Sequence, residues 1–251
     1  MGGPLVLLAT LWALGATGAA ALRIGAFNIQ SFGDSKVLDP ACGGIIAQIL
    51  AGYDITLVQE VRDPDLSAVS ALMEQINSVS RHEYSFVSSE PLGRDQYKEM
   101  YLFVYRKDAV SVLDTYQYPD PGDVFSREPF VVKFSAPGSG DALVLGRVRL
   151  CGVLVRFCWG GGDLLFLGDF NADCNYVRAR DWPSVRLRSS EVFKWLIPDS
   201  ADTTVGNSDC AYDRIVVCGA RLRRSLKCHR LSLQALAISD HFPVEVTLKS
   251  R

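Results

Sequence analysis

Short runs of apolar or alternating residues recur along the chain and are separated by polar stretches. They are rich in Val, Ile, Phe and Tyr, as is typical of strands that are buried against other layers. These runs predict strands at residues 22–29, 54–61, 99–106, 129–134, 164–170, 213–217 and 242–248.

Other segments carry apolar residues at helical spacing and predict helices at residues 39–52, 63–80 and 189–197. In the second of these we expect Asp63 to be the N-cap and Pro64 to take the first helical position. No internal repeat and no obvious linker interrupts the pattern. We therefore expect residues 22–251 to form a single mixed α/β domain, with sheets covered by helices.

The first residues follow a different pattern. Residues 5–21 are apolar and small, which predicts a signal peptide at residues 1–21 with cleavage near Ala21. The stretch is short for a membrane span and no second long apolar run follows it. We expect a secreted protein that does not associate with membranes. An additional cytoplasmic pool is the alternative that stays open.

Polar residues recur where the predicted strands meet loops. Carboxylate and amide oxygens are the ligands that Mg²⁺ and Mn²⁺ prefer, and a histidine beside them suits proton transfer near neutral pH. Metal, amide and histidine together are typical of phosphodiester hydrolysis. The residues in question are Asn28, Glu60, Glu99, Asp169, Asn171, Asp213, Asp240 and His241.

Charge limits how the chain can hold a nucleic acid. The chain has 26 basic and 28 acidic residues, for a net charge of −2. A protein that binds nucleic acid through bulk charge is basic. Local arginines and metal ions would have to offset the phosphate charge instead.

Several motifs together resemble the secreted deoxyribonuclease I family. They include AFNIQSFG, LVQEVRD, EPLGRDQYKEMYLFVYR, FSREPFVVKF, GDFNADC, CAYDRIVV and ALAISDHFPVEVTL, in family order over most of the chain. The resemblance implies a four-layer α/β sandwich of the endonuclease/exonuclease/phosphatase type, in which two packed mixed sheets are covered by helices. It also implies a monomeric, divalent-cation-dependent endonuclease that cuts double-stranded DNA and leaves 5′-phosphate ends.

The resemblance assigns roles to individual residues. Asn28 and Glu60 would hold Mg²⁺ or Mn²⁺, and Asp169, Asn171 and Asp240 would complete the metal and phosphate site. Asp213 would orient His241 as one half of an acid–base pair, and Glu99 would orient a second histidine.

The same resemblance implies further sites outside this centre. Arg62 and Tyr97 would contact the DNA minor groove, with Arg127 beside them, and Cys174 would pair with Cys210. Two Ca²⁺ sites are also implied. One comprises Asp202, Thr204 and Ser208, and the other comprises Asp120, Asp123, the Phe125 carbonyl and Glu128.

The resemblance breaks at residues 135–163 and 227–234. The first segment contains no histidine where the family carries its first catalytic one, and we expect the fold to lack a strand and a helix there. An altered transcript or gene model is the favoured explanation, because extra cysteines and lost family residues coincide. The alternative is a remodelled segment in which Cys151, Cys158, Cys228 and His229 bind zinc.

The missing histidine leaves other functions open. The chain could be an impaired relative that binds DNA or metal, or an unstable variant. It could also be a phosphomonoesterase of the same fold, which GDFN and SDHFPV alone would permit, although Arg62 and Tyr97 argue against it. Tight actin binding is not expected, because position 88 is Ser where the actin-binding relative has a larger apolar residue.

Overall fold

A computed structural model describes residues 21–135, 142–146, 163–231 and 238–249. The predicted signal peptide therefore lies outside the described residues, apart from Ala21. Within the described part of the chain, no helix is both long enough and apolar enough to span a bilayer.

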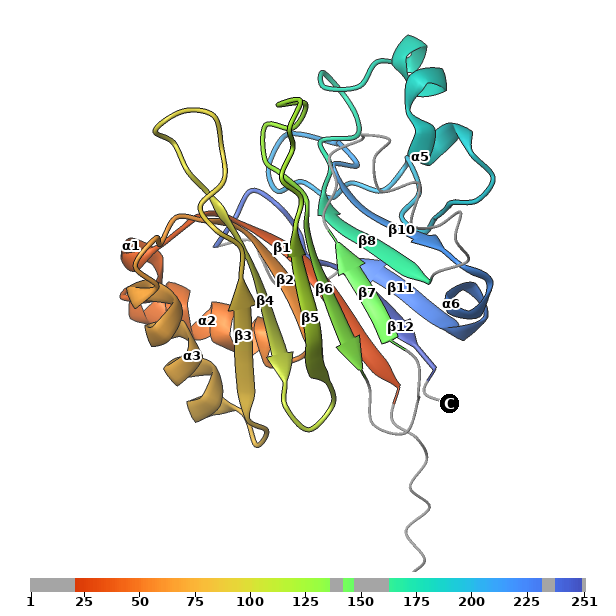
Figure 1. Ribbon diagram of the computed structural model, residues 1–251. Helices are drawn as coiled ribbons and strands as arrows, with labels where there is room; N and C mark the ends of the chain where they lie inside the picture. The colour runs from red at the N-terminus through yellow and green to blue at the C-terminus, as the bar shows by residue number, and fades with distance from the viewer. Residues whose placement is uncertain (1–20, 136–141, 147–162, 232–237, 250–251) are drawn as a thin grey trace, which may run out of the picture.

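Two six-stranded mixed sheets form the centre of the molecule (Figure 1). The β1/β2 and β7/β8 pairs are parallel, and the other pairs are antiparallel. The first sheet has the order β11 (Leu226–Leu231), β12 (Val244–Leu248), β1 (Leu22–Phe32), β2 (Ile55–Val61), β4 (Met100–Arg106) and β3 (Tyr84–Ser88). The second has the order β5 (Ser111–Gln117), β6 (Phe130–Ser135), β7 (Ala142–Gly146), β8 (Leu164–Asp169), β10 (Asp213–Cys218) and β9 (Lys194–Trp195).

Helices cover the outer face of the first sheet. They are α1 (Asp34–Val37), α2 (Pro40–Leu50) and α3 (Ser67–Val79), and Figure 1 shows them on the side of that sheet away from the second one. The outer face of the second sheet packs against the segment that carries the 3₁₀ helix η1 (Ala179–Ser184) and α5 (Arg186–Ser189). A further short helix, α6 (Ala220–Ser225), follows β10. The predicted α/β architecture of packed mixed sheets is confirmed.

The apolar core between the sheets ends in polar side chains. On β1, Ile24 and Ala26 face the other sheet and Asn28 follows at the same spacing of two. The same progression runs from Ile55 and Leu57 to Gln59, from Leu165 and Leu167 to Asp169, and from Val217 and Ile215 to Asp213. We call Asn28, Gln59, Asp169 and Asp213 the polar layer, and all of its members are buried.

Two helix predictions need correction. Helix α3 begins at Ser67, with Leu66 as its N-cap, although the Asp63 carboxylate still accepts a hydrogen bond from the Val69 N–H at 2.7 Å. The helix expected at 189–197 is wrong. Helix α5 ends at Ser189, and Lys194–Trp195 forms β9 because it pairs with β10.

The first divergent segment keeps a strand. Residues 142–146 form β7, which pairs with β6 and β8 and makes the second sheet continuous. The expected loss of a strand is therefore wrong. The expected loss of a helix falls within residues 147–162, outside the described residues, as do Cys151 and Cys158 of the zinc alternative.

Cysteine pairing agrees with the resemblance where it can be followed. Cys174 is bonded to Cys210, 36 positions further along the sequence. Cys218 is also disulfide-bonded, which the sequence did not indicate. Cys42 carries a free thiol.

Candidate active site

The side chains predicted to bind metal meet at the end of the inter-sheet core. The Asn28 Nδ2 group donates to Glu60 Oε1 at 2.9 Å and lies 3.3 Å from Asp169 Oδ2. These residues come from β1, β2 and β8, so the contact joins the two sheets. The structure thus brings Asn28, Glu60 and Asp169 together as the sequence predicted.

Glu60 and Asn171 have unusual backbone conformations, which orient their side chains. Glu60 has φ 59° and its Oε2 accepts from the backbone N–H of Ser31, which has φ 52°. Asn171 has φ 49°, and its backbone N–H and its amide both donate to Asp169, at 2.7 and 3.1 Å. Positive φ outside glycine costs on the order of 1 kcal/mol or more per residue and concentrates at functional sites.

A histidine–aspartate pair stands beside this group. His241 Nδ1 lies 2.6 Å from Asp213 Oδ2, and both side chains are buried. Burial opposes the protonated imidazole, but the charge and hydrogen bond of Asp213, with Asp169 and Asp240 nearby, raise the pKa of His241 to about 10. With Nδ1 on Asp213, the Nε2 atom is free to exchange a proton, and its nearest carboxylate contact is Asp240 at 3.9 Å.

Ser239 connects the histidine loop to β1. Its hydroxyl donates to the Asn28 carbonyl at 2.7 Å and accepts from the Gln30 N–H at 3.2 Å. It also lies 3.3 Å from the backbone N–H of His241. Asp240 is held more loosely, through the Gln30 amide at 3.2 Å, and its side chain is half exposed.

The donor set fits a small hard cation. Asn28 Oδ1 is buried without a hydrogen-bond partner in the described part of the chain, while the adjacent Glu60 and Asp169 supply carboxylate oxygens. No three His, Cys, Asp or Glu side chains converge on one point among the described residues. Magnesium is commonly held by one or two carboxylates, with water and phosphate oxygens completing its shell.

Glu99 has a different partner from the one expected. Its Oε2 accepts from Arg127 Nε at 3.1 Å, where the resemblance implied a histidine. Glu99 sits just before β4, in a bridge with Leu92. Of the remaining histidines, His82 pairs with Asp108 at the surface, and the His229 side chain lies outside the described part. The expectation that Glu99 orients an imidazole finds no support in the described residues.

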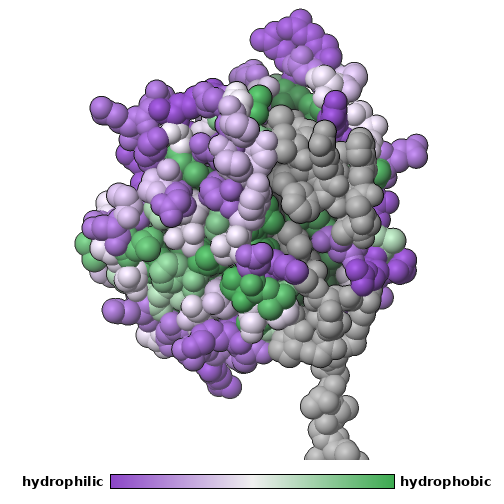
Figure 2. All heavy atoms as spheres, viewed as in Figure 1, coloured by the Kyte–Doolittle hydropathy of each residue, from purple (hydrophilic) through white to green (hydrophobic). Residues whose placement is uncertain are grey.

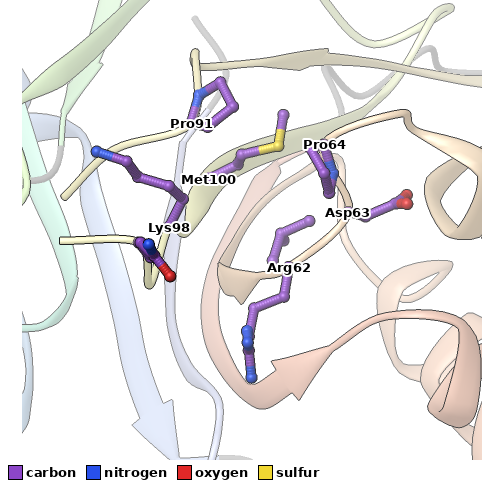
Figure 3. A pocket seen from close by; sticks show the side chains of 8 residues that line it. Arg62, Asp63, Pro64, Pro91, Lys98 and Met100 are labelled. Carbon is purple, nitrogen blue, oxygen red and sulfur yellow. The ribbon is translucent and has the colours of Figure 1, made fainter.

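The three predicted DNA-contacting residues form one cluster. The guanidinium carbon of Arg62 lies 4.3 Å from the ring centre of Tyr97, and that of Arg127 lies 5.7 Å from it. Tyr97 is 42% exposed, so its ring is available to a ligand. A neighbouring pocket has a volume of about 240 Å³ and is lined in part by Pro64, Pro91 and Met100. Figure 3 shows the guanidinium of Arg62 extending away from Met100 at this pocket.

Hydrogen bonds join some members of each predicted calcium site. Asp202 Oδ1 accepts from the N–H and hydroxyl of Thr204, and that hydroxyl lies 2.9 Å from the Ser208 carbonyl. In the other site, Asp120 Oδ2 accepts from the Phe125 N–H at 2.8 Å. Asp120 Oδ1 and Glu128 Oε2 are buried and have no hydrogen-bond partner in the described part of the chain, and Asp123 pairs with Arg94.

Some residues of the site were not predicted. Gln59 is a buried member of the polar layer, and Ser239 is buried against the Asn28 carbonyl. Tyr212 lies beside His241 with ring centres 6.2 Å apart. The exposed Tyr176 packs on Tyr212 in turn. The only signal for these four residues in the sequence is their position, because each lies directly before or shortly after a residue that was predicted.

The chain is similar to known proteins over nearly its whole length. Residues 25–241 match the model of the Endonuclease/Exonuclease/phosphatase family. The chain is 69% identical to human Deoxyribonuclease-1-like 2 (99% of each chain covered) and 52% identical to chicken Deoxyribonuclease-1 (93% and 94% covered). The fold is also that of humanized D. rerio TDP2, with a TM-score of 0.65, 17% identity, and 92% and 99% of the two chains covered.

Proposed function

We propose that this chain, which belongs to the endonuclease/exonuclease/phosphatase family and to the deoxyribonucleases within it, hydrolyses phosphodiester bonds of double-stranded DNA. The observation that carries the proposal is the buried His241–Asp213 pair beside Asn28, Glu60 and Asp169. Deoxyribonuclease-1 and its like-2 relative are named for this activity, and they match most of the chain.

The proposed reaction needs two proton movements. Water attacks the phosphorus, the bond to the 3′ oxygen breaks, and the products are a 5′-phosphate and a 3′-hydroxyl. His241, aligned by Asp213, takes or gives a proton at Nε2, and the Asn171 amide hydrogen-bonds a phosphate oxygen. A divalent cation held by Asn28, Glu60 and Asp169 would neutralise phosphoryl charge when bound.

Only one of the two proton transfers has an assigned imidazole. Glu99 contacts Arg127, and no second imidazole lies at the site among the described residues, so we assign the other transfer to solvent. General acid–base assistance raises a reaction rate by roughly 10²- to 10⁴-fold. We therefore propose that this chain cuts DNA more slowly, by about this factor, than relatives that carry both catalytic histidines. The alignment to mouse Deoxyribonuclease-1-like 2 spans 277 positions for a chain of 251 residues, which supports a loss of residues relative to that protein.

The surroundings of the site support duplex DNA as the substrate. Arg62 and Arg127 flank the exposed ring of Tyr97, and two cations around an aromatic ring suit a sugar–phosphate backbone. We also propose secretion, because the Cys174–Cys210 bond persists in oxidising compartments. Calcium at the two predicted sites would be structural.

Plasmid nicking tests this proposal. Purified chain with Mg²⁺ and Ca²⁺ should convert supercoiled plasmid to nicked circles, and His241→Ala should abolish the conversion. His82→Ala is the matched control, because His82 pairs with Asp108 at the surface and should leave the rate unchanged. Equal nicking by His241→Ala would refute the proposed mechanism. Cleavage of an inositol phospholipid in preference to plasmid would favour the phosphomonoesterase alternative.

A further inference from the structure

Gln59 is the one member of the polar layer that has no role in the proposed chemistry. It is 1% exposed and follows Ile55 and Leu57 on the face of β2 that looks toward the second sheet. Its Oε1 accepts a hydrogen bond from the backbone N–H of Asp169, on β8, at 2.7 Å. A single side-chain amide therefore ties the two sheets together at the site.

Gly168 makes this contact possible. The residue has φ +110°, which L side chains rarely adopt, and a Cβ added to it would lie 2.1 Å from Gln59 Oε1. Any side chain at position 168 would push the amide of Gln59 away from Asp169. The two sequence motifs LVQEV and GDFN thus fit each other across the sheets.

Stability alone gives little reason for an amide at position 59. The Nε2 group is buried and has no hydrogen-bond partner among the described residues. A buried donor without a partner costs roughly 1–3 kcal/mol. An apolar side chain would remove that cost, but it would also take the Gln59 acceptor from the buried N–H of Asp169 at a similar cost, so the two alternatives are nearly equal in stability. The acceptor half of the amide, by contrast, is fully engaged at Asp169.

The consequence of the contact is geometric. Gln59 is bonded in sequence to Glu60 and through its side chain to Asp169, so it holds the backbones of two carboxylates that lie in different sheets. The Asn28 amide reaches both carboxylates only while they stay within a few ångströms of each other, at 2.9 and 3.3 Å.

We propose that Gln59 is a positioning residue, whose amide sets the separation of Glu60 and Asp169 and thereby the cation affinity of the site. This inference rests on the proposed function for the identity of the cation site. The contact itself does not depend on that function.

The test compares three variants of the full chain. Gln59→Met keeps the length of the side chain and removes the acceptor, whereas Gln59→Asn keeps the amide and shortens its reach. Thr56→Val is the matched control, because Thr56 is equally buried on β2 and its hydroxyl also has no hydrogen-bond partner in the described part of the chain.

Mn²⁺ affinity is the first measurement, by titration calorimetry. Both Gln59 variants should bind Mn²⁺ about 10- to 100-fold more weakly than the parent chain, as is usual when the support of a metal ligand is removed. Thr56→Val should bind it normally. The thermal midpoint of Gln59→Met should stay close to that of Thr56→Val, because the substitution removes an unpaired buried donor at the same time as it removes the acceptor of the Asp169 N–H, and the two effects are of similar size.

Amide NMR signals provide the second measurement, without metal. In Gln59→Met the NMR signals of the Asp169 backbone amide and the Asn28 side-chain amide should both shift. In Thr56→Val both signals should stay where they are in the parent chain. If Gln59→Met leaves Mn²⁺ affinity and both signals as in the control, the inference is overturned. If the parent chain binds no Mn²⁺, the proposed cation site fails, and the two NMR signals alone decide the role of Gln59.

Discussion

The carboxylate of Glu99 accepts a hydrogen bond from the guanidinium of Arg127, with Oε2 and Nε 3.1 Å apart. Arg127 also lies near the ring of Tyr97, so it stands between the acidic residue and the exposed aromatic one. The contact ties Glu99 to the surface that we propose for DNA, and in the described part of the chain no imidazole contacts this carboxylate.

Substitution of Glu99 should therefore have a small effect on hydrolysis. We expect Glu99→Gln to change the nicking rate by less than about tenfold, because its partner among the described residues is Arg127 rather than an imidazole, whereas His241→Ala should lower it by roughly 10²–10⁴. Initial rates of plasmid nicking measure both. A loss in Glu99→Gln as large as that in His241→Ala would mean that Glu99 takes part in the chemistry.

Arg62 and Arg127 should contribute to DNA affinity through phosphate contacts. Each change to Ala is expected to weaken duplex binding at low salt and to reduce the slope of log affinity against log salt concentration by about 1. Fluorescence anisotropy at several salt concentrations measures the slope. Arg81→Ala serves as the control, because Arg81 is exposed in the bend that follows α3, and an identical change in its slope would contradict the assignment.

The His241–Asp213 pair predicts a pH-dependent stability in EDTA. The pKa of His241 is raised to about 10 in the folded chain, above the value of about 6.5 expected for an unfolded histidine. The stabilisation is then fully present below about pH 6.5 and is lost as the pH rises through about 10. Asp213→Asn should remove it.

Urea unfolding at pH 6 and pH 10 tests the direction in which the stabilisation by this pair changes with pH. The parent chain should be more stable than Asp213→Asn by roughly 3–5 kcal/mol at pH 6, and the difference should shrink toward pH 10. A difference that grows with pH would contradict the raised pKa.

Calcium should stabilise the loop that contains Asp120 and Glu128. Both carboxylates have a buried oxygen for which the described residues offer no partner, and bound Ca²⁺ would satisfy these oxygens. At about 100 times its dissociation constant, Ca²⁺ should add roughly 2.7 kcal/mol per site to the free energy of unfolding. We expect Asp120→Asn to abolish the contribution of this site.

Asp95→Asn is the control for this change, because Asp95 is exposed and its charge acts on Arg94 as that of Asp120 does. Thermal unfolding with and without Ca²⁺ measures the shift. An equal loss of the Ca²⁺ response in both variants would show a general charge effect rather than a site.

The Cys174–Cys210 bond should contribute a large share of the stability. Closing a loop with this separation of 36 residues stabilises a chain by roughly 3–4 kcal/mol on the chain-entropy estimate. Cys174→Ser with Cys210→Ser should lower the free energy of unfolding by about that amount. Cys42→Ser is the matched control, because Cys42 has a free thiol, and it should unfold like the parent chain.

The sequence predicted the parts of the site that end apolar runs. Asn28 and Asp169 follow, and Asp213 precedes, an apolar run that the structure places between the sheets, so strand pattern and chemistry pointed the same way. Gln59 ends the same kind of run, but its neighbour Glu60 is the stronger chemical signal. Its contact with Asp169 spans 110 residues, which no local pattern reveals.

Other features depended on contacts that are distant in sequence. Lys194 and Trp195 have apolar neighbours at helical spacing, yet pairing with Val216 and Val217 makes them a strand. The pairing of Arg127 with Glu99 joins the segment before β4, in the first sheet, to the segment between β5 and β6, in the second, across 28 residues. Tertiary contacts overrode local preference at each of these positions.

The order in which the chain is synthesised bears on the first and last strands. Asn28 lies on β1, which pairs with β2 on one side and β12 on the other, and Ser239 links Asn28 to the loop of His241. A nascent chain therefore cannot complete the site until residues near 241 have left the ribosome, and until then the β12 side of β1 has no native partner. A premature stop after β10 would yield a product that keeps most of both sheets and every carboxylate of the polar layer, but has no imidazole at its centre.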